Sequence, residues 1–288
     1  MKKRSYYIIN LVILLFTIVF FIQSFFQNLR LLHGKETITI IFAGAFAGIV
    51  IVHLFKGIRL YFLVLEERPT VARFLKLYVK TTLVNLVFPF KLGELFRIYS
   101  FGHEWKNYKA GLLLILVDRY FDTIPLMLLL IGFTISGKGT LYGIVVVLTV
   151  FIAVVTVMYF IFPSTYKYMN RFLIVNTNSE RGLYALAILK KIRYWYLYVK
   201  ELINGRELIL VVLSVCVWLV EYGSLYCLIS GLGYSFEPSY FLDYMNSVFS
   251  GHSSEYVSQY VGVSAWVLAI VSLLVYGRQF IKRKRKLK

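Results

Sequence analysis

The chain has 288 residues, of which 59% are apolar or aromatic and 16% are charged, against about 25% charged residues in soluble domains. This composition excludes a soluble globular protein and indicates an integral membrane protein. The net charge of +18 points to anionic lipid surfaces rather than nucleic acid, because the cations lie between apolar segments. Two cysteines and four scattered histidines provide no disulfide framework and no metal site, so we expect neither a metal nor a cofactor.

Apolar stretches of about 20 residues are long enough to cross the hydrocarbon core as helices. We find six, at approximately residues 6–26, 37–60, 110–136, 141–162, 208–230 and 260–276. The first is too long for a cleaved signal peptide and is followed by no small-residue cleavage site. The sequence thus predicts one all-α polytopic membrane domain over residues 1–288, with about six transmembrane helices.

The distribution of Lys and Arg predicts the orientation, because these residues are retained on the cytoplasmic side of a membrane. With the N-terminus inside, 28 of the 32 fall inside: residues 2–4, ten between Lys56 and Lys109, eight between Lys167 and Arg206, and seven between Arg278 and Lys288. Arg30, Lys35 and Lys138 fall outside, and Arg119 is assigned to a span. We therefore expect both termini in the cytoplasm and the chain in the cytoplasmic (inner) membrane of a prokaryote.

Two segments are too polar for ordinary spans and too apolar for loops. Residues 70–101, on the inside, are interrupted by Pro89 and Gly93, and residues 238–259, on the outside, by Gly251 and the polar residues after it. Each segment is typical of a re-entrant hairpin. Because broken backbone at membrane depth is tolerated only against protein or a water-filled cavity, the two hairpins predict a polar interior.

The two hairpins resemble each other at an offset of 161 residues, which indicates an inverted repeat with halves 1–138 and 139–288. Five pairs of identical residues carry this resemblance: Asn85 and Asn246, Val87 and Val248, Phe88 and Phe249, Glu94 and Glu255, and Tyr99 and Tyr260. Three spans per half would place the second copy upside down, as in many transporters. The alternative is a chance likeness between two aromatic-rich segments.

Charged residues also occur inside the predicted span 110–136, where each costs about 2.5–3.5 kcal/mol near the helix centre. Asp118 and Asp122 share a helix face, and Arg119 can pair with Asp122 across one turn. One interpretation is a self-neutralising cluster that locks this helix against a neighbour. The other is the lining of a substrate cavity.

The first hairpin offers a candidate phosphate site at Lys91, Glu94 and Arg97. A helix that begins after Pro89 and Gly93 exposes backbone N–H groups that favour an anion, and Arg97 can hold a phosphate through two hydrogen bonds. The alternative places both cations at the cytoplasmic interface, with Glu94 paired to Arg97. Glu94 and its repeat counterpart Glu255 are both candidates to pair with Arg119 or to bind a coupling proton.

The sequence resembles the family of the lysylphosphatidylglycerol synthase transmembrane region. The resemblance rests on Pro89, Gly93-Glu94 and Arg97, followed by Asp118-Arg119 and Asp122, with Asp118 in place of the usual Glu. The Pro-Gly-Gly-rich turn of the family is replaced by the sequence Ser-Gly-His-Ser-Ser-Glu at residues 250–255. The resemblance implies the flippase-like membrane half of the multiple-peptide-resistance factor, or one of its stand-alone relatives. Because the chain ends at Lys288 without a soluble aminoacyl-transferase domain, we expect no lysyl transfer.

These observations predict a transporter or flippase of an anionic lipid rather than an enzyme. The cargo would be a phospholipid, an aminoacyl-phospholipid or a sugar linked to polyprenyl phosphate. The phosphate would be held by three cations, Lys91, Arg97 and Arg119. Four carboxylates would balance the charge of these cations or contact a cationic headgroup: Glu94, Asp118, Asp122 and Glu255. We expect the bilayer and the lipid as partners, no nucleic acid, and leave a homo-oligomer open.

Two alternatives belong to other functional classes. A membrane-embedded lipid-modifying transferase would use Asp118 and Asp122 as a base or as metal ligands, although a neighbouring arginine makes a poor Mg²⁺ site. A non-transporting partner would instead scaffold an envelope-polymer assembly.

Overall fold

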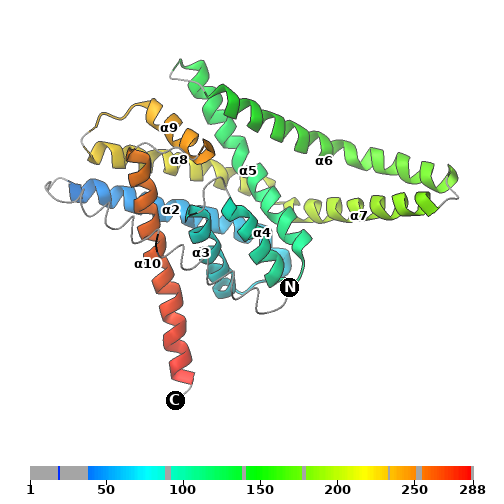
Figure 1. Ribbon diagram of the computed structural model, residues 1–288, viewed down its shortest axis with the longest axis horizontal. Coiled ribbons are helices and arrows are strands. Elements are labelled where there is room, and N and C mark those ends of the chain that lie inside the picture. The colour runs from blue at the N-terminus through cyan, green and yellow to red at the C-terminus, as the bar shows by residue number, and fades with distance from the viewer. Residues whose placement is uncertain are drawn as a thin grey trace.

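The computed structural model describes residue 19 and residues 38–87, 92–137, 141–176, 180–232, 234–250 and 255–286. Every regular element in these ranges is helical. The helices are α2 (Ile38–Val64), a short 3-10 turn η1 (Leu65–Glu67), α3 (Val71–Val87), α4 (Leu92–Glu104), α5 (Tyr108–Ile135), α6 (Tyr142–Asn176), α7 (Glu180–Ile203), α8 (Glu207–Gly231), α9 (Pro238–Ser250) and α10 (Glu255–Lys286). Figure 1 shows their arrangement, and the prediction of an all-α membrane fold is confirmed.

Four helices in the described ranges are long and apolar enough to cross a membrane: Ala43–Glu67, Tyr142–Val175, Glu207–Gly231 and Tyr256–Val275. They correspond to four of the six predicted spans. The predicted span 110–136 forms α5, in which Asp118, Arg119 and Asp122 interrupt the apolar run. The predicted span 6–26 lies outside the described residues.

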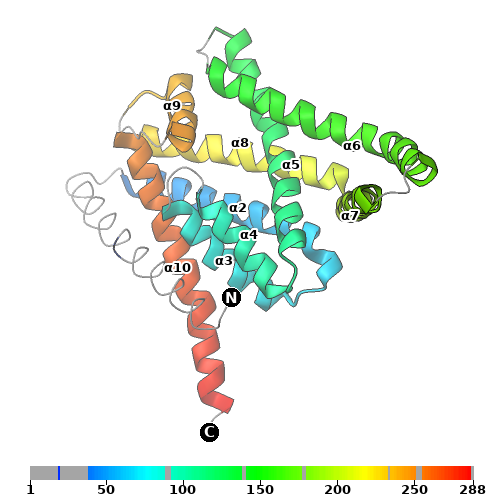
Figure 2. The same cartoon turned by 45° about the vertical axis from the view of Figure 1, so that its right-hand side comes forward.

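Helices α2 and α8 pack against each other in antiparallel directions and form the centre of the molecule (Figures 1 and 2). Small residues allow this approach, because a Cβ atom added at Gly48 would lie 2.1 Å from Ser224 Oγ. Farther along the same pair, Arg206 donates to the backbone oxygen of Phe62 at 3.0 Å. This contact fixes the register of α2 against α8, which positions the polar residues described below.

The first predicted hairpin is present as the helix pair α3 and α4, which pack side by side. An added Cβ at Gly93 would lie 2.2 Å from the Cα of Asn85, so only glycine permits this approach of the two backbones. A turn then leads into α5, where the Asn107 side chain accepts a hydrogen bond from the backbone N–H of Ala110 at 3.2 Å and caps the helix. The hairpin is thereby held against the charged helix α5.

Helices α6 and α7 form an arm that extends away from the other helices (Figure 1). At 1.5 Å per residue, the 35 residues of α6 span about 52 Å, more than the thickness of the hydrocarbon core, and only 6% of its apolar window is buried. Helix α7 folds back along it through Tyr196, whose ring lies 4.9 Å from that of Phe162. Two residues farther along α7, burial and the carboxylate of Glu67 raise the pKa of Tyr198.

The second predicted hairpin differs from the prediction in its second arm. Helix α10 runs without interruption from Glu255 to Lys286, so the hairpin arm and the predicted last span 260–276 form a single helix. The physical reason is that the polar Ser258 and Gln259 and the lone Gly262 do not break a helical pattern. In the first half, by contrast, a turn separates α4 from α5. The inverted repeat stays a prediction.

Candidate functional site

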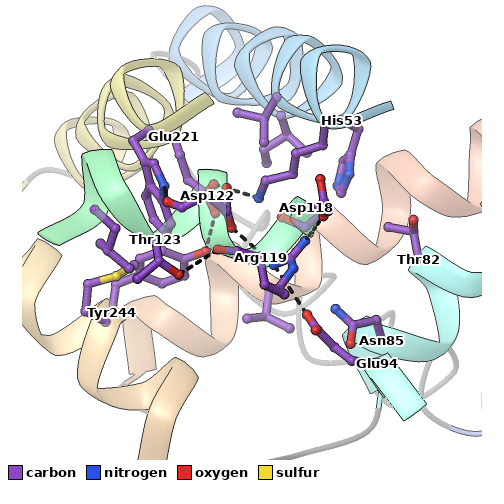
Figure 3. Close-up of a pocket in the computed structure, with 18 of the residues that line it drawn as sticks. His53, Thr82, Asn85, Glu94, Asp118, Arg119, Asp122, Thr123, Glu221 and Tyr244 are labelled. Carbon is purple, nitrogen blue, oxygen red and sulfur yellow. Dashed lines mark hydrogen bonds and ion pairs between the residues drawn. The ribbon is translucent and has the colours of Figure 1, made fainter. Parts of the chain in front are cut away.

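A cavity of about 320 Å³ lies where α2, α3, α4, α5, α8, α9 and α10 meet, and Leu148 of α6 also lines it. Both hairpins contribute to it: Thr82 and Arg97 come from the first, and Tyr244 and Tyr260 from the second. Figure 3 shows charged side chains converging on it from several helices. Its polar lining consists of His53, Lys56, Tyr78, Thr82, Asn85, Glu94, Arg97, Asp118, Arg119, Asp122, Thr123, Glu221, Tyr244, Ser247, Tyr260 and Ser264.

The fully buried Arg59 of α2 binds both aspartates of α5 from behind the lining. Its Nε donates to Asp118 Oδ1 at 2.8 Å, and its Nη1 donates to Asp122 Oδ1 at 2.6 Å and to Ser214 Oγ at 2.8 Å. The spacing of four residues places both aspartates on one face of α5, toward α2. Trp218 also donates to the backbone oxygen of Asp122 at 2.9 Å. These contacts connect α2, α5 and α8.

Arg119 contacts three carboxylates on the cavity side. Its Nη2 lies 2.7 Å from Asp118 Oδ2, and its Nη1 lies 3.1 Å from Asp122 Oδ2 and 3.3 Å from Glu94 Oε1. Together with Arg59, it supplies a guanidinium donor to every carboxylate oxygen of the two aspartates. The cluster therefore lines the cavity and also locks α5 against its neighbours, so the two interpretations of these residues are compatible.

Arg97 lines the cavity from α4 with far fewer partners than Arg119. It is 5% exposed, and its Nη2 donates to Thr82 Oγ1 at 3.1 Å. In the described part of the chain it forms no ion pair, and its Nε, Asn85 Oδ1 and His53 Nδ1 are buried without hydrogen-bond partners. Glu94 pairs with Arg119 instead, so the alternative in which Arg97 pairs with Glu94 at the interface is wrong. Arg97 thus presents a buried positive charge to the cavity.

A second ion pair lies across the cavity, between α2 and α8. Lys56 Nζ contacts Glu221 Oε2 at 2.8 Å and lies 5.9 Å from the ring centroid of Trp218. The hydroxyl of Tyr244 from α9 donates to the other oxygen of Glu221. Tyr260 from α10 lines the same region. Here a carboxylate is held by a lysine and a tyrosine instead of by arginines.

The structure brings together most of the predicted site residues that it describes. Glu94, Arg97, Asp118, Arg119 and Asp122 all line the cavity, and Gly93 lies one residue from it on α4. The other predicted residues lie outside the described part of the chain: Pro89, Lys91, Gly251 and the side chain of Glu255.

Sequence reasoning missed the contribution of α2. It assigned Lys56 and Arg59 to the cytoplasmic surface and left Arg119 as the one cation of a span, and this is wrong: both lie within the apolar helix Ala43–Glu67, and Arg59 is fully buried. The signal was available, because both residues fall inside the predicted span 37–60, and charges within a span are candidate functional residues by default.

The described residues contain no cluster of three or more His, Cys, Asp or Glu side chains that could hold a metal ion. In addition, guanidinium groups occupy the oxygens of Asp118 and Asp122. The cationic and hydroxyl side chains of the cavity can bind a charged group through ion pairs and hydrogen bonds.

Comparison with known proteins identifies one family. Residues 7–251 match the family described as the lysylphosphatidylglycerol synthase TM region. The chain shows no significant match to a curated protein or to a solved structure.

Proposed function

Because the chain belongs to the family of the lysylphosphatidylglycerol synthase TM region, we propose that it carries an anionic lipid headgroup across the membrane through the central cavity. Membership of this family connects the protein with lipid handling. The proposed cargo is a phospholipid, an aminoacyl-phospholipid or a polyprenyl-phosphate-linked sugar. These lipids share a phosphate group next to long apolar chains.

The observation that carries the proposal is the buried guanidinium of Arg97 at the cavity, which forms no ion pair among the described residues. An ionised headgroup that enters hydrocarbon alone faces a desolvation cost of tens of kcal/mol. A transporter must therefore supply polar groups along the route. Arg97 can offer a phosphate two parallel hydrogen bonds, whereas Nη1 and Nη2 of Arg119 are directed at Glu94, Asp118 and Asp122.

The size of the cavity supports a headgroup rather than a whole lipid as the bound species. Its 320 Å³ falls near the lower end of ligand pockets, which measure about 300–1,000 Å³. A glycerophosphate or sugar phosphate fits this space, while the acyl or prenyl chains stay in the bilayer.

The arrangement of the carboxylates favours transport over the transferase alternative. A general base or a metal ligand needs a free carboxylate oxygen, and Asp118 and Asp122 direct all of theirs at guanidinium donors. Arginine does not give up its proton in proteins, so these pairs persist across the physiological pH range.

A reconstituted-vesicle assay tests the proposal. Purified protein would be inserted into vesicles containing headgroup-labelled phosphatidylglycerol or a labelled polyprenyl phosphate sugar, and the label reaching the other leaflet would be measured. Arg97→Gln should slow translocation about 10- to 150-fold, which corresponds to the loss of about 1.5–3 kcal/mol from hydrogen bonds to a charged group.

The matched control is Arg193→Gln, which removes an exposed arginine on α7 that contacts Tyr166. This variant should translocate at the wild-type rate. Translocation of every labelled lipid at the protein-free rate would contradict the proposal.

A further inference from the structure

We infer that Glu221 takes up a proton when a lipid phosphate enters the cavity, and that this frees Lys56 to pair with the phosphate. The inference rests on the proposed function and adds a proton that is bound together with the lipid. Transport of the anionic lipid would be coupled to a proton at the pair formed by Lys56 and Glu221.

Glu221 differs from the other carboxylates of the described lining in the nature of its partner. The other carboxylates have arginine partners. Arg119 contacts Glu94, Asp118 and Asp122, and Arg59 contacts both aspartates as well. The ion-pair partner of Glu221 is a lysine. A lysine ammonium is a point charge on a flexible stem, whereas a guanidinium that bridges two carboxylates is held in a fixed geometry. The pair of Lys56 and Glu221 can therefore separate while the arginine cluster stays intact.

Charge balance explains why phosphate entry requires a proton. The described lining carries the cations Lys56, Arg97 and Arg119 and four carboxylates, and Arg59 behind it supplies the fourth positive charge. A phosphate adds a negative charge to this balanced set in a space of low dielectric, where an uncompensated charge is costly. One proton bound by a carboxylate restores neutrality.

The surroundings of Glu221 make it the carboxylate that can accept this proton. The groups that contact or lie near it are Lys56 from α2, Tyr244 from α9 and Tyr260 from α10. Figure 3 places Asp122 from α5 beside Glu221 and His53 farther away. In the absence of lipid, Lys56 and the Tyr244 hydroxyl stabilise the ionised carboxylate. When a phosphate attracts Lys56, Glu221 is left near two negative charges, those of the phosphate and of Asp122, which favours its protonated form.

Lys56 is placed to make this exchange of partners. Both residues line the cavity, and the Lys56 side chain is 25% exposed whereas that of Glu221 is 6% exposed, so the lysine is the more accessible member of the pair. Arg97 lines the same cavity from α4. A phosphate between them would contact Arg97 on one side and Lys56 on the other.

The coupling is reciprocal, because a proton that favours lipid binding must itself be bound more tightly when the lipid is present. Binding of the lipid should therefore take up protons from the buffer, and its dissociation constant should rise with pH by up to about tenfold per unit.

Calorimetry of the full-length protein in detergent measures this uptake. Dioctanoyl phosphatidylglycerol and, separately, farnesyl phosphate would be titrated in two buffers of different ionisation enthalpy, and the difference in heat gives the protons taken up. We expect about one proton per phosphatidylglycerol in the wild type and almost none in Glu221→Gln. An infrared band of a protonated carboxyl group should appear on lipid binding and be missing in Glu221→Gln.

Asp243→Asn is the matched control, because Asp243 on α9 is an exposed carboxylate that accepts a hydrogen bond from Tyr256, much as Glu221 does from Tyr244. It should keep the proton uptake of the wild type. Lys56→Gln should weaken lipid binding about tenfold or more.

The outcomes separate the two proposals. If neither lipid binds the wild type, the proposed function is wrong. If a lipid binds without proton uptake, or if Glu221→Gln keeps the uptake, only the proton inference is overturned. Unchanged affinity in Lys56→Gln overturns the exchange of partners by Lys56.

Discussion

Individual residues in the cavity have different roles although they carry the same charge. Arg59 is fully buried and binds two aspartates, while Arg97 is nearly as buried and forms no ion pair among the described residues. Breaking a buried ion pair leaves an uncompensated charge, which costs about 3–5 kcal/mol. Removing an unpaired arginine leaves no such charge behind. Stability and binding should therefore depend on different arginines.

Arg59→Gln should destabilise the protein by about 3–5 kcal/mol, because two buried carboxylates then share Arg119 alone. Thermal unfolding in detergent, followed by tryptophan fluorescence, measures the effect. Adding Asp118→Asn to this variant should recover part of the loss. Arg97→Gln serves as the comparison at the same cavity and should melt close to the wild type. Equal melting of Arg59→Gln and wild type would show that the arginine cluster does not hold α2 and α5 together.

At the scale of elements, close backbone approach decides where the charged side chains lie. The pair α3 and α4 presents Thr82, Asn85, Glu94 and Arg97 to the cavity from two adjacent helices. This geometry depends on Gly93, which lies against the backbone of Asn85. The close approach at Gly93 thus positions these side chains at the cavity.

Gly93→Ala should push α4 away from α3, because the new Cβ would lie 2.2 Å from a backbone carbon that cannot move aside. We expect a loss of about 1–3 kcal/mol in stability and weaker lipid binding. Gly132→Ala in α5 is the control, since nothing lies within 4 Å of its added Cβ, and it should stabilise the helix by up to about 1 kcal/mol. Comparable melting temperatures and lipid affinities in the two variants would contradict this account of the hairpin.

At the scale of the whole molecule, the antiparallel pair α2 and α8 supplies the frame on which both hairpins converge (Figure 2). The arm of α6 and α7 extends from this frame with its apolar surface exposed. In an orientation with both termini inside, the basic helix α7 lies on the cytoplasmic side, where anionic headgroups attract Lys190, Lys191 and Arg193.

Cysteine labelling in whole cells tests this orientation. In a chain with Cys216 and Cys227 replaced by alanine, Lys191→Cys on α7 should react with a membrane-impermeant maleimide only after the cells are opened. Ser136→Cys, at the exposed end of α5, should react in intact cells. The opposite pattern would invert the topology. Each variant acts as the control for the other, because both positions are exposed.

The sequence by itself determined the class of the protein, the approximate positions of the described spans and five residues of the cavity. These follow from local properties: a run of about 20 apolar residues suits the bilayer, and charges within such a run are rare and costly. The continuity of α10 did not follow from the apolar run alone, because that run begins only after the polar Ser258 and Gln259, whereas polar residues do not end a helix.

The pairing of Arg119 with Asp122 follows from their spacing on one helix and is confirmed, but only the tertiary structure decided which charges pair between helices. Lys56 and Glu221 are 165 residues apart, and Arg59 is 59 residues from Asp118. Their pairing depends on the register of α2 against α5 and α8, which arises from packing at sites such as Gly48 and Ser224. The sequence therefore shows that a charge within a span needs a partner, but helix packing selects that partner. In this fold the packing leaves Arg97 without a carboxylate partner among the described residues.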